Sequence, residues 1–242
     1  MTAREFWWSL GVSTLLTMGL FAPLPWHLTT LAYQPLQTDG QFSVWNVAWV
    51  AHALLTQPAT VAHANIFHPH TWTLFYSEPN LLAGLVAVPA YWWTGSPYAA
   101  LNSVVLISCI ASATAMYGLC RQLLTDRWAC AVGALGFAYA PHVVSHLLHV
   151  QLLMTAGLPM SLLALHRLIE APSLRRGAWL GGALTVQAYG CGYYAVFAIL
   201  AVGLGLVVLL TASQQWASPR AWRAIGIAVV LSIATTAPLA FG

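Results

Sequence analysis

Long apolar stretches separated by short polar segments dominate the pattern of hydrophobic and polar positions along the chain. A membrane span needs ~20 mainly apolar residues, or somewhat fewer where its flanks are favourable. Gly and Pro recur inside the stretches, as membrane helices tolerate. We therefore predict seven spans, the first an uncleaved signal anchor. They are Phe6–Leu24, Tyr98–Cys120, Trp128–Tyr139, Leu152–Leu168, Ala178–Tyr189, Tyr193–Thr211 and Ile225–Leu239.

The arginines determine the predicted orientation. All eight basic residues are Arg, and they lie near the ends of the predicted spans. Short cytoplasmic loops are enriched in such residues. If the seven spans cross the membrane in alternating directions, every arginine lies on the cytoplasmic side. The arginines are Arg4, Arg121, Arg127, Arg167, Arg175, Arg176, Arg220 and Arg223.

One further apolar stretch, Leu81–Trp93, is shorter than the others and is interrupted by Pro89. We interpret it as interfacial or re-entrant on the outer side, because a crossing here would put Arg121 and Arg127 outside. The alternative is a short true span, which displaces the topology after it by one crossing.

Composition excludes several classes of protein. Charged residues make up 5% of the 242 residues and hydrophobic residues 60%, whereas an average soluble domain carries roughly 25% charge. A water-soluble globular protein, a disordered chain and a nucleic-acid binder are all incompatible with these values. The four cysteines have no CxxC spacing, and we interpret them as small core residues. The predicted fold is all-α, a polytopic transmembrane helix bundle with 1–242 as a single domain.

With this orientation, residues 25–97 form one large non-cytoplasmic segment that has no Lys or Arg and contains Asp39 and Glu78. Long loops that persist are usually functional. Within the segment, the aromatic spacing over Gln41–Leu55 predicts a helix lying at the membrane interface. Asp39 stands just before this helix. Because Asp is a preferred N-cap residue, an ordinary capping role for Asp39 remains an alternative.

Imidazoles gather on the same predicted side. His68 and His70 precede Glu78 in the first outer segment, and the second outer loop contains three more histidines before Gln151. The spacing of His142, His146 and His149 puts them on one face of a helical turn. Carboxylates and imidazoles at one interface can supply a general base and a divalent-metal site. A polar surface without a catalytic role is the alternative.

The order of these features resembles the GT-C superfamily of integral-membrane glycosyltransferases. One N-terminal span is followed by a long outer loop with an early Asp, an amphipathic helix, and an acidic residue before a Pro-containing apolar stretch. The chain looks like a bacterial branch related to protein O-mannosyltransferases and lipid A aminoarabinose transferases. The resemblance is carried by Asp39-Gly40-Gln41, Asn65-Ile66-Phe67-His68-Pro69, Tyr76-Ser77-Glu78, Phe137-Ala138-Tyr139-Ala140-Pro141-His142 and His149-Val150-Gln151.

The resemblance implies an inverting transfer of sugar from a polyprenyl-phosphate carrier to an acceptor at the outer face of the bacterial inner (plasma) membrane. Asp39 matches the first-loop carboxylate that activates the acceptor, and Glu78 the second acidic position. The family's adjacent acidic pair is absent, since Gly40 follows Asp39. No Lys or Arg is present on this side to bind the carrier phosphate, so we expect His142, His146 or His149 to replace it, or the group to come from sequence beyond this chain. The substrate-binding candidates are His68, His70, His142, His146, His149 and Gln151.

Two expectations concern the protein as a whole. The chain ends directly after an apolar span, so we expect it to be the N-terminal part of a longer protein. A membrane transporter and a non-enzymatic membrane protein remain alternatives to the enzyme. No acidic or basic residue lies within the apolar core of a predicted span, which disfavours a proton-coupled pump.

Overall fold

The computed structural model describes residues 1–32 and 38–240, and within these ranges it contains helices and turns but no strands. Three short 3-10 turns lie at Leu24–Trp26, Pro58–Thr60 and Thr73–Tyr76. The α-helices are α1 (Ala3–Leu20), α2 (Thr38–Thr56), α3 (Leu81–Thr94), α4 (Pro97–Leu123), α5 (Arg127–Ala138), α6 (Pro141–Ser145), α7 (Val150–Leu153), α8 (Gly157–Glu170), α9 (Leu174–Gly190), α10 (Gly192–Ala212) and α11 (Pro219–Ala240).

Five helical segments of the described chain are long and apolar enough to cross a membrane. The protein is thus an all-helical integral membrane protein with several candidate spans. Two predicted spans, those now seen as α1 and α9, fall outside this set. The helix α9 has 17 residues, and α1 has the charged Arg4 and Glu5 near its start. The five segments are Pro97–Leu123, Arg127–Ser145, Val150–Glu170, Gly192–Ala212 and Pro219–Leu239.

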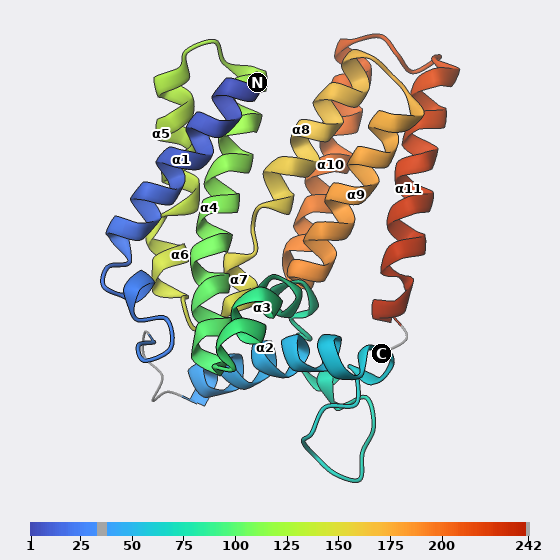
Figure 1. Ribbon diagram of the computed structural model, residues 1–242. Coiled ribbons are helices and arrows are strands. Elements are labelled where there is room, and N and C mark those ends of the chain that lie inside the picture. The colour runs from blue at the N-terminus through green and yellow to red at the C-terminus, as the bar shows by residue number, and fades with distance from the viewer. Residues whose placement is uncertain (33–37, 241–242) are drawn as a thin grey trace.

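The long helices stand in two groups above α2 (Figure 1). In one group α4 packs against α1 and α5, in the other α9 packs against α8, α10 and α11, and α4 contacts α8 between the groups. The N-terminus and the turns at 124–126, 171–173 and 213–218 lie at one end, and α2 and α3 lie at the other. We name these the arginine end and the α2 end, because all eight arginines lie in or near those turns and the N-terminus.

Local hydrogen bonds define the helix starts at the arginine end. The side chains of Asp126 and Ser173 accept backbone N–H groups of α5 and α9 respectively, as N-cap residues do. Glu5 of α1 forms an ion pair of 2.9 Å with Arg121 of α4. This ion pair holds the N-terminus of α1 beside the turn between α4 and α5.

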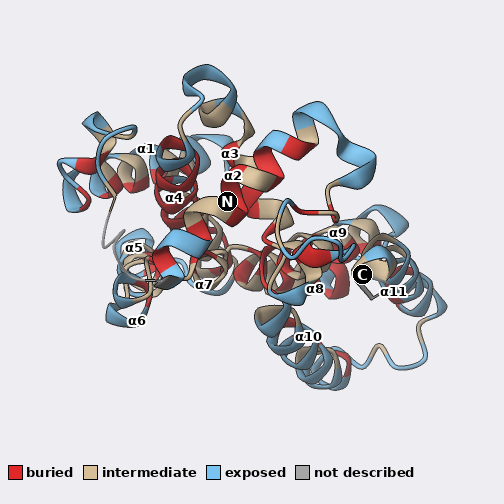
Figure 2. Cartoon of the chain, turned by 90° about the horizontal axis from the view of Figure 1, so that it is seen from below, coloured by how far each residue is buried: buried red, intermediate tan, exposed pale blue. Residues whose placement is uncertain are grey.

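The helix α10 is largely exposed, as its mostly pale blue colour in Figure 2 indicates, and many of its exposed side chains are apolar. Phe197, Leu200 and Leu204 are each more than half exposed. Removing apolar surface from water stabilises a protein by about 25 cal/mol per Å², and this stabilisation is lost where such a surface stays in water. A continuous surface of this kind is suited to contact with lipid.

Small residues allow α9 and α11 to approach closely. Gly177 and Gly181 are four residues apart on α9 and face Ala224 and Ala228 on α11. A Cβ atom built on Gly181 would lie 2.8 Å from the carbonyl oxygen of Ala228. Small residues at this spacing are a common interface in membrane helix pairs, and here they bring α11 against α9.

The helix α2 lies across the α2 end of the bundle (Figure 1) and packs against α3 and α4. Its residues Val47, Val50 and Ala51 are fully buried. The 14 residues of α3 are too few for an ordinary span, and α3 lies beside α2. This position agrees with the interfacial interpretation of Leu81–Trp93.

Candidate functional site

Asp39 lies in the first turn of α2, which begins at Thr38. The sequence had suggested a helix over Gln41–Leu55 with Asp39 in front of it, so the helix starts earlier than predicted. Any N-cap residue of α2 lies before Thr38, outside the described residues. A carboxylate in the first turn is stabilised by the partial positive charge of the helix N-terminus. The Asp39 side chain is 70% exposed, which leaves its oxygens accessible.

The carboxylate of Asp39 contacts the second outer loop. Its Oδ2 atom lies 3.3 Å from Nε2 of His149. One turn further along α2, the Ser43 hydroxyl donates a hydrogen bond to the carbonyl oxygen of Leu148. Residues 39 and 43 share one face of the helix, so two neighbouring contacts attach this face of α2 to the chain just before α7.

His142, His146 and His149 form a row of imidazole rings. Ring centroids are separated by 4.3 Å between His142 and His146 and by 5.8 Å between His146 and His149. The sequence placed them on one face of a helical turn, and in the structure α6 ends at Ser145 and a turn contains His146. Within this turn the backbone N–H of His149 donates a hydrogen bond of 2.9 Å to the carbonyl oxygen of His146. The row ends at Asp39.

Hydrogen bonds orient the middle ring of this row. Nδ1 of His146 lies 2.7 Å from the carbonyl oxygen of His142 and 3.0 Å from the hydroxyl oxygen of Ser145. A carbonyl oxygen only accepts hydrogen bonds, so Nδ1 donates to it and the neutral ring has its free lone pair at Nε2. Nε2 of His146 is therefore available to accept a proton or to bind a substrate group.

The three imidazoles do not share a metal-binding geometry. Among the residues that the structure describes, no three His, Cys, Asp or Glu side chains are arranged so that they could hold a metal ion. The divalent metal ion suggested by the sequence stays a prediction.

Glu78 has a different environment from Asp39. Its Oε1 accepts a hydrogen bond of 2.8 Å from the backbone N–H of Gly192, the first residue of α10. Its carbonyl oxygen accepts hydrogen bonds of 3.2 Å from the side-chain amides of both Asn46 and Asn80. Among the described residues, the Glu78 carboxylate forms no hydrogen bond or ion pair with Asp39 or with the row of histidines. The contacts of Glu78 are those of a residue that positions the start of α10.

Glu78 and Asp39 nevertheless lie on the same side of α2. Asn46, which holds the backbone of Glu78, is seven residues after Asp39, so both project from the same face of the helix. At a rise of ~1.5 Å per residue, the two contact points are about 10 Å apart along the axis. The backbone of Glu78 thus borders the face of α2 that presents Asp39.

The remaining predicted residues lie apart from this pair. His68 and His70 are exposed in the loop that projects below α2, where the ring of His70 lies 6.5 Å from that of Tyr76. Gln151 is half-buried in α7, two residues after His149. The structure therefore brings together Asp39 and the three histidines of the second loop, but it does not join them to His68 or His70.

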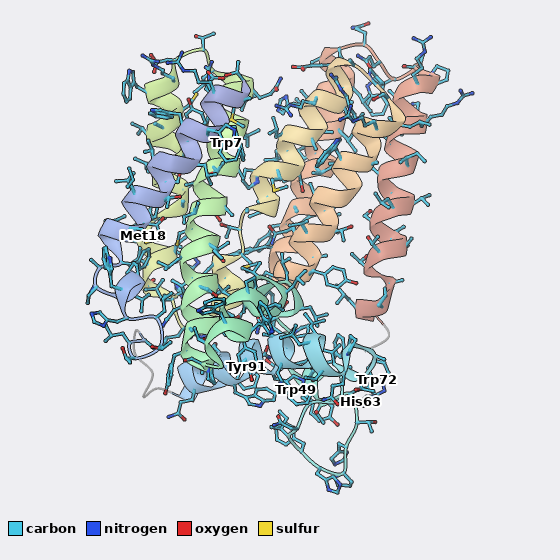
Figure 3. The ribbon with its side chains drawn as sticks, viewed as in Figure 1. Trp7, Met18, Trp49, His63, Trp72 and Tyr91 are labelled. Atoms are coloured by element: carbon cyan, nitrogen blue, oxygen red, sulfur yellow. The ribbon has the colours of Figure 1, made fainter. Side chains whose placement is uncertain are left out.

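A cleft of about 560 Å³ lies on the opposite face of α2. Trp45, Ala48 and His52 project into it at roughly 180–240° around the helix from Asp39, at ~100° per residue. Trp49 and Tyr91 border it as well and lie at the α2 end in Figure 3. The sequence indicated Trp45 and Trp49 as interfacial aromatics, but it gave no signal that Tyr91 would join them. The other lining residues are Gln41, Val44, Asn65, Pro97 and Tyr98.

Comparisons with known proteins add no relative. A scan against protein-family models and searches of curated proteins and of solved structures found no match to this chain.

Proposed function

We propose that the chain is a membrane-embedded glycosyltransferase that takes a sugar from a polyprenyl-phosphate carrier at its α2 end. The observation that supports this proposal most directly is the 3.3 Å contact between Oδ2 of Asp39 and Nε2 of His149. A carboxylate beside an imidazole, exposed at the end of membrane-spanning helices, can accept a proton from a substrate delivered at the membrane surface.

The topology in this proposal has seven crossings. Helices α1 and α9 run between the same two ends as the five candidate spans (Figure 1), which supports counting them as crossings. Because cytoplasmic loops collect arginine, the arginine end faces the cytoplasm and the α2 end faces outward. The membrane in this proposal is the bacterial plasma membrane.

Asp39 is the proposed general base. Its carboxylate takes the proton of the acceptor hydroxyl while the acceptor oxygen forms a bond to the anomeric carbon of the sugar. The bond between this carbon and the carrier phosphate breaks, and the phosphate leaves with the electron pair. Attack from the face opposite the phosphate inverts the anomeric configuration. The contact with His149 holds the Asp39 carboxylate in place. Less conformational entropy is therefore lost when the base is positioned against the acceptor hydroxyl.

The row of histidines is the proposed contact for the carrier phosphate. No Lys or Arg occurs between Arg4 and Arg121 or between Arg127 and Arg167, so imidazole is the basic side chain available in both outer segments. A protonated imidazole donates charge-assisted hydrogen bonds to phosphate oxygens. His146, with Nε2 free, is the best placed of the three to supply one. In this proposal Glu78 positions α10 and does not touch the substrate.

The experiment measures sugar release by the full chain reconstituted in lipid vesicles. The probes are synthetic polyprenyl phosphates that carry mannose, glucose or aminoarabinose, with release to water or to an added acceptor as the readout. Asp39→Asn should lower the rate by roughly 10²- to 10⁴-fold, the usual contribution of a general base.

Asp126→Asn is the matched control, because it makes the same chemical change at the arginine end. Asn is as good an N-cap residue as Asp, so α5 should keep its start and the release rate should be unchanged. Unaltered release by Asp39→Asn, or no release of any of the three sugars by the wild-type protein, would contradict the proposed function.

A further inference from the structure

A second cavity lies between α8 and α9 at the arginine end, far from the residues of the proposed reaction. Its volume is about 220 Å³. Residues at spacings of three and four on each helix form its two walls, so one stripe of α8 faces one stripe of α9. The lining residues that matter here are Met160, Leu163 and Arg167 on α8, and Arg176, Trp179 and Ala183 on α9.

Two guanidinium groups mark one end of this otherwise apolar cavity. Nη1 of Arg176 donates a hydrogen bond to the carbonyl oxygen of Arg167. Nε of Arg167 contacts Oε1 of Gln122 at 3.5 Å, and the amide of Gln122 donates in turn to Glu170. Each guanidinium has five N–H donors, so most of them have no acceptor among the described residues.

The positive charge of the cavity is not neutralised by a direct ion pair. Among the described residues, neither Arg167 nor Arg176 lies within ion-pair distance of a carboxylate. Glu170, the nearest acidic group in this network, is separated from Arg167 by the side chain of Gln122. The site therefore has unpaired cationic donors at its polar end and apolar walls behind them, an arrangement suited to an anion with an apolar body.

We propose that this cavity binds the phosphate group of an anionic phospholipid from the leaflet at the arginine end. Arg167 and Arg176 donate to the phosphate oxygens, and the acyl chains lie along the outer surface beside Trp179, which is 61% exposed. Basic pockets between membrane helices bind anionic lipid headgroups in this way. The volume is below the roughly 300–1,000 Å³ of pockets that enclose whole small molecules, so the headgroup enters and the chains stay in the bilayer.

A lipid fits this site better than a free phosphate ion. Met160, Leu163 and Trp179 contribute apolar surface that a free, fully hydrated ion does not use. The cavity also lies between α8 and α9, beside the exposed indole of Trp179. This inference does not depend on the proposed transferase activity.

Native mass spectrometry of the detergent-solubilised full chain tests the proposal. The probes are phosphatidylglycerol, the neutral-headgroup lipid phosphatidylcholine and free glycerol 3-phosphate, each titrated separately. Wild-type protein should retain one phosphatidylglycerol in preference to phosphatidylcholine. The double variant Arg167→Gln/Arg176→Gln should weaken that binding about 30-fold, which corresponds to about 1 kcal/mol for each arginine.

Arg175→Gln is the matched control, since Arg175 is exposed, precedes Arg176 and does not line the cavity. It removes one positive charge from the same turn. If binding depends on the two cavity arginines and not on general surface charge, the affinity for phosphatidylglycerol should stay within about twofold of the wild type. Arg167→Lys/Arg176→Lys keeps the charge and shows whether a loss of binding follows from charge or from misfolding.

Three results would overturn the proposal. The first is equal retention of phosphatidylglycerol by the wild type and the double glutamine variant. The second is a loss of binding in Arg175→Gln as large as in the double variant. The third is binding of glycerol 3-phosphate as tight as that of phosphatidylglycerol, which would assign the site to a soluble phosphate compound.

Discussion

Gly192 donates its backbone N–H to Oε1 of Glu78 across 2.8 Å, and this contact joins two segments that are 114 residues apart in the chain. The first N–H groups of a helix have no partner within the helix and are commonly satisfied by a side-chain oxygen. Glu78 supplies that oxygen and places a negative charge at the positive end of the 21-residue helix α10. The same residue is the second acidic position in the proposed family resemblance, so its role can be tested.

Glu78→Ala should lower the free energy of unfolding by about 1 kcal/mol, in the range for loss of a helix cap. Glu78→Gln keeps an acceptor oxygen and should cost less. Because the Glu78 carboxylate does not contact Asp39, both variants should release sugar at nearly the wild-type rate. Thermal unfolding in detergent and the vesicle assay measure the two effects, and Glu170→Ala at the arginine end serves as the control. A large fall in sugar release by Glu78→Gln without loss of stability would assign Glu78 to the chemistry instead.

The sequence predicted the helices better than it predicted the site. The apolar runs located the long helices to within about six residues at each end, because each run must be covered by lipid or by another helix over its whole length. The arginine pattern also predicted that Asp39 and His149 lie at the same end, where the structure brings them into contact. The partner of Glu78 could not be predicted, because the contact with Gly192 depends on how α3 packs against the bundle and not on a local pattern.

Some features of the site depend on more than a local pattern. The spacing of His142, His146 and His149 placed them on one face of a helical turn, and their rings form a row although the helix α6 ends at Ser145. The cleft beside Trp45 and Trp49 also needs residues from α3 and α4, which no periodicity within α2 can indicate. The pair Gly177 and Gly181 did contain a sequence signal, since small residues four apart are typical of close helix packing in membranes.

Cys191 should react slowly with thiol reagents. It lies between α9 and α10 and is fully buried. Burial raises the pKa of its thiol above the ordinary value. A hydrogen bond from the backbone N–H of Tyr194 lowers the pKa in part, and the charge of Glu78 raises it by a smaller amount. The thiolate is the reactive form, and a raised pKa reduces its fraction at any pH below that pKa. Alkylation by N-ethylmaleimide should therefore be slow at pH 7 and become faster as the pH rises.

The reference for this measurement is Ser77→Cys, an exposed position at the same end of the molecule. Mass spectrometry of the alkylated peptides should give a lower rate for Cys191 than for the introduced cysteine throughout the pH range below the raised pKa. Glu78→Gln should increase the rate at Cys191 slightly, because it removes the smaller of the two raising causes. Equal rates at the two positions in the folded protein would contradict the burial of Cys191.

Cysteines at three exposed positions test the seven-crossing topology. Ser77 precedes α3, Thr94 is the last residue of α3, and Thr125 lies in the turn between α4 and α5. If α3 does not cross the membrane, cysteines at Ser77 and Thr94 should both react with a membrane-impermeant maleimide added to intact cells. The cysteine at Thr125 should react only in inverted vesicles. Labelling of Ser77→Cys and Thr94→Cys from opposite sides would make α3 a true span and shift every later crossing.

The close packing of α9 and α11 predicts that replacing Gly181 with Ala lowers stability, whereas replacing the adjacent Gly182 with Ala does not. A Cβ atom at Gly181 would lie 2.8 Å from the carbonyl oxygen of Ala228 and 3.1 Å from Cβ of Leu231, so α11 must move to admit it. Overpacking of this kind costs about 1–3 kcal/mol, more than the roughly 0.5–1 kcal/mol that Ala gains over Gly within a helix. Gly182 has no atom within 4 Å of such a Cβ, so Gly182→Ala should be neutral or slightly stabilising. Unfolding midpoints followed by tryptophan fluorescence in detergent measure both variants. If Gly181→Ala is as stable as Gly182→Ala, then α11 does not pack against α9 through these small residues.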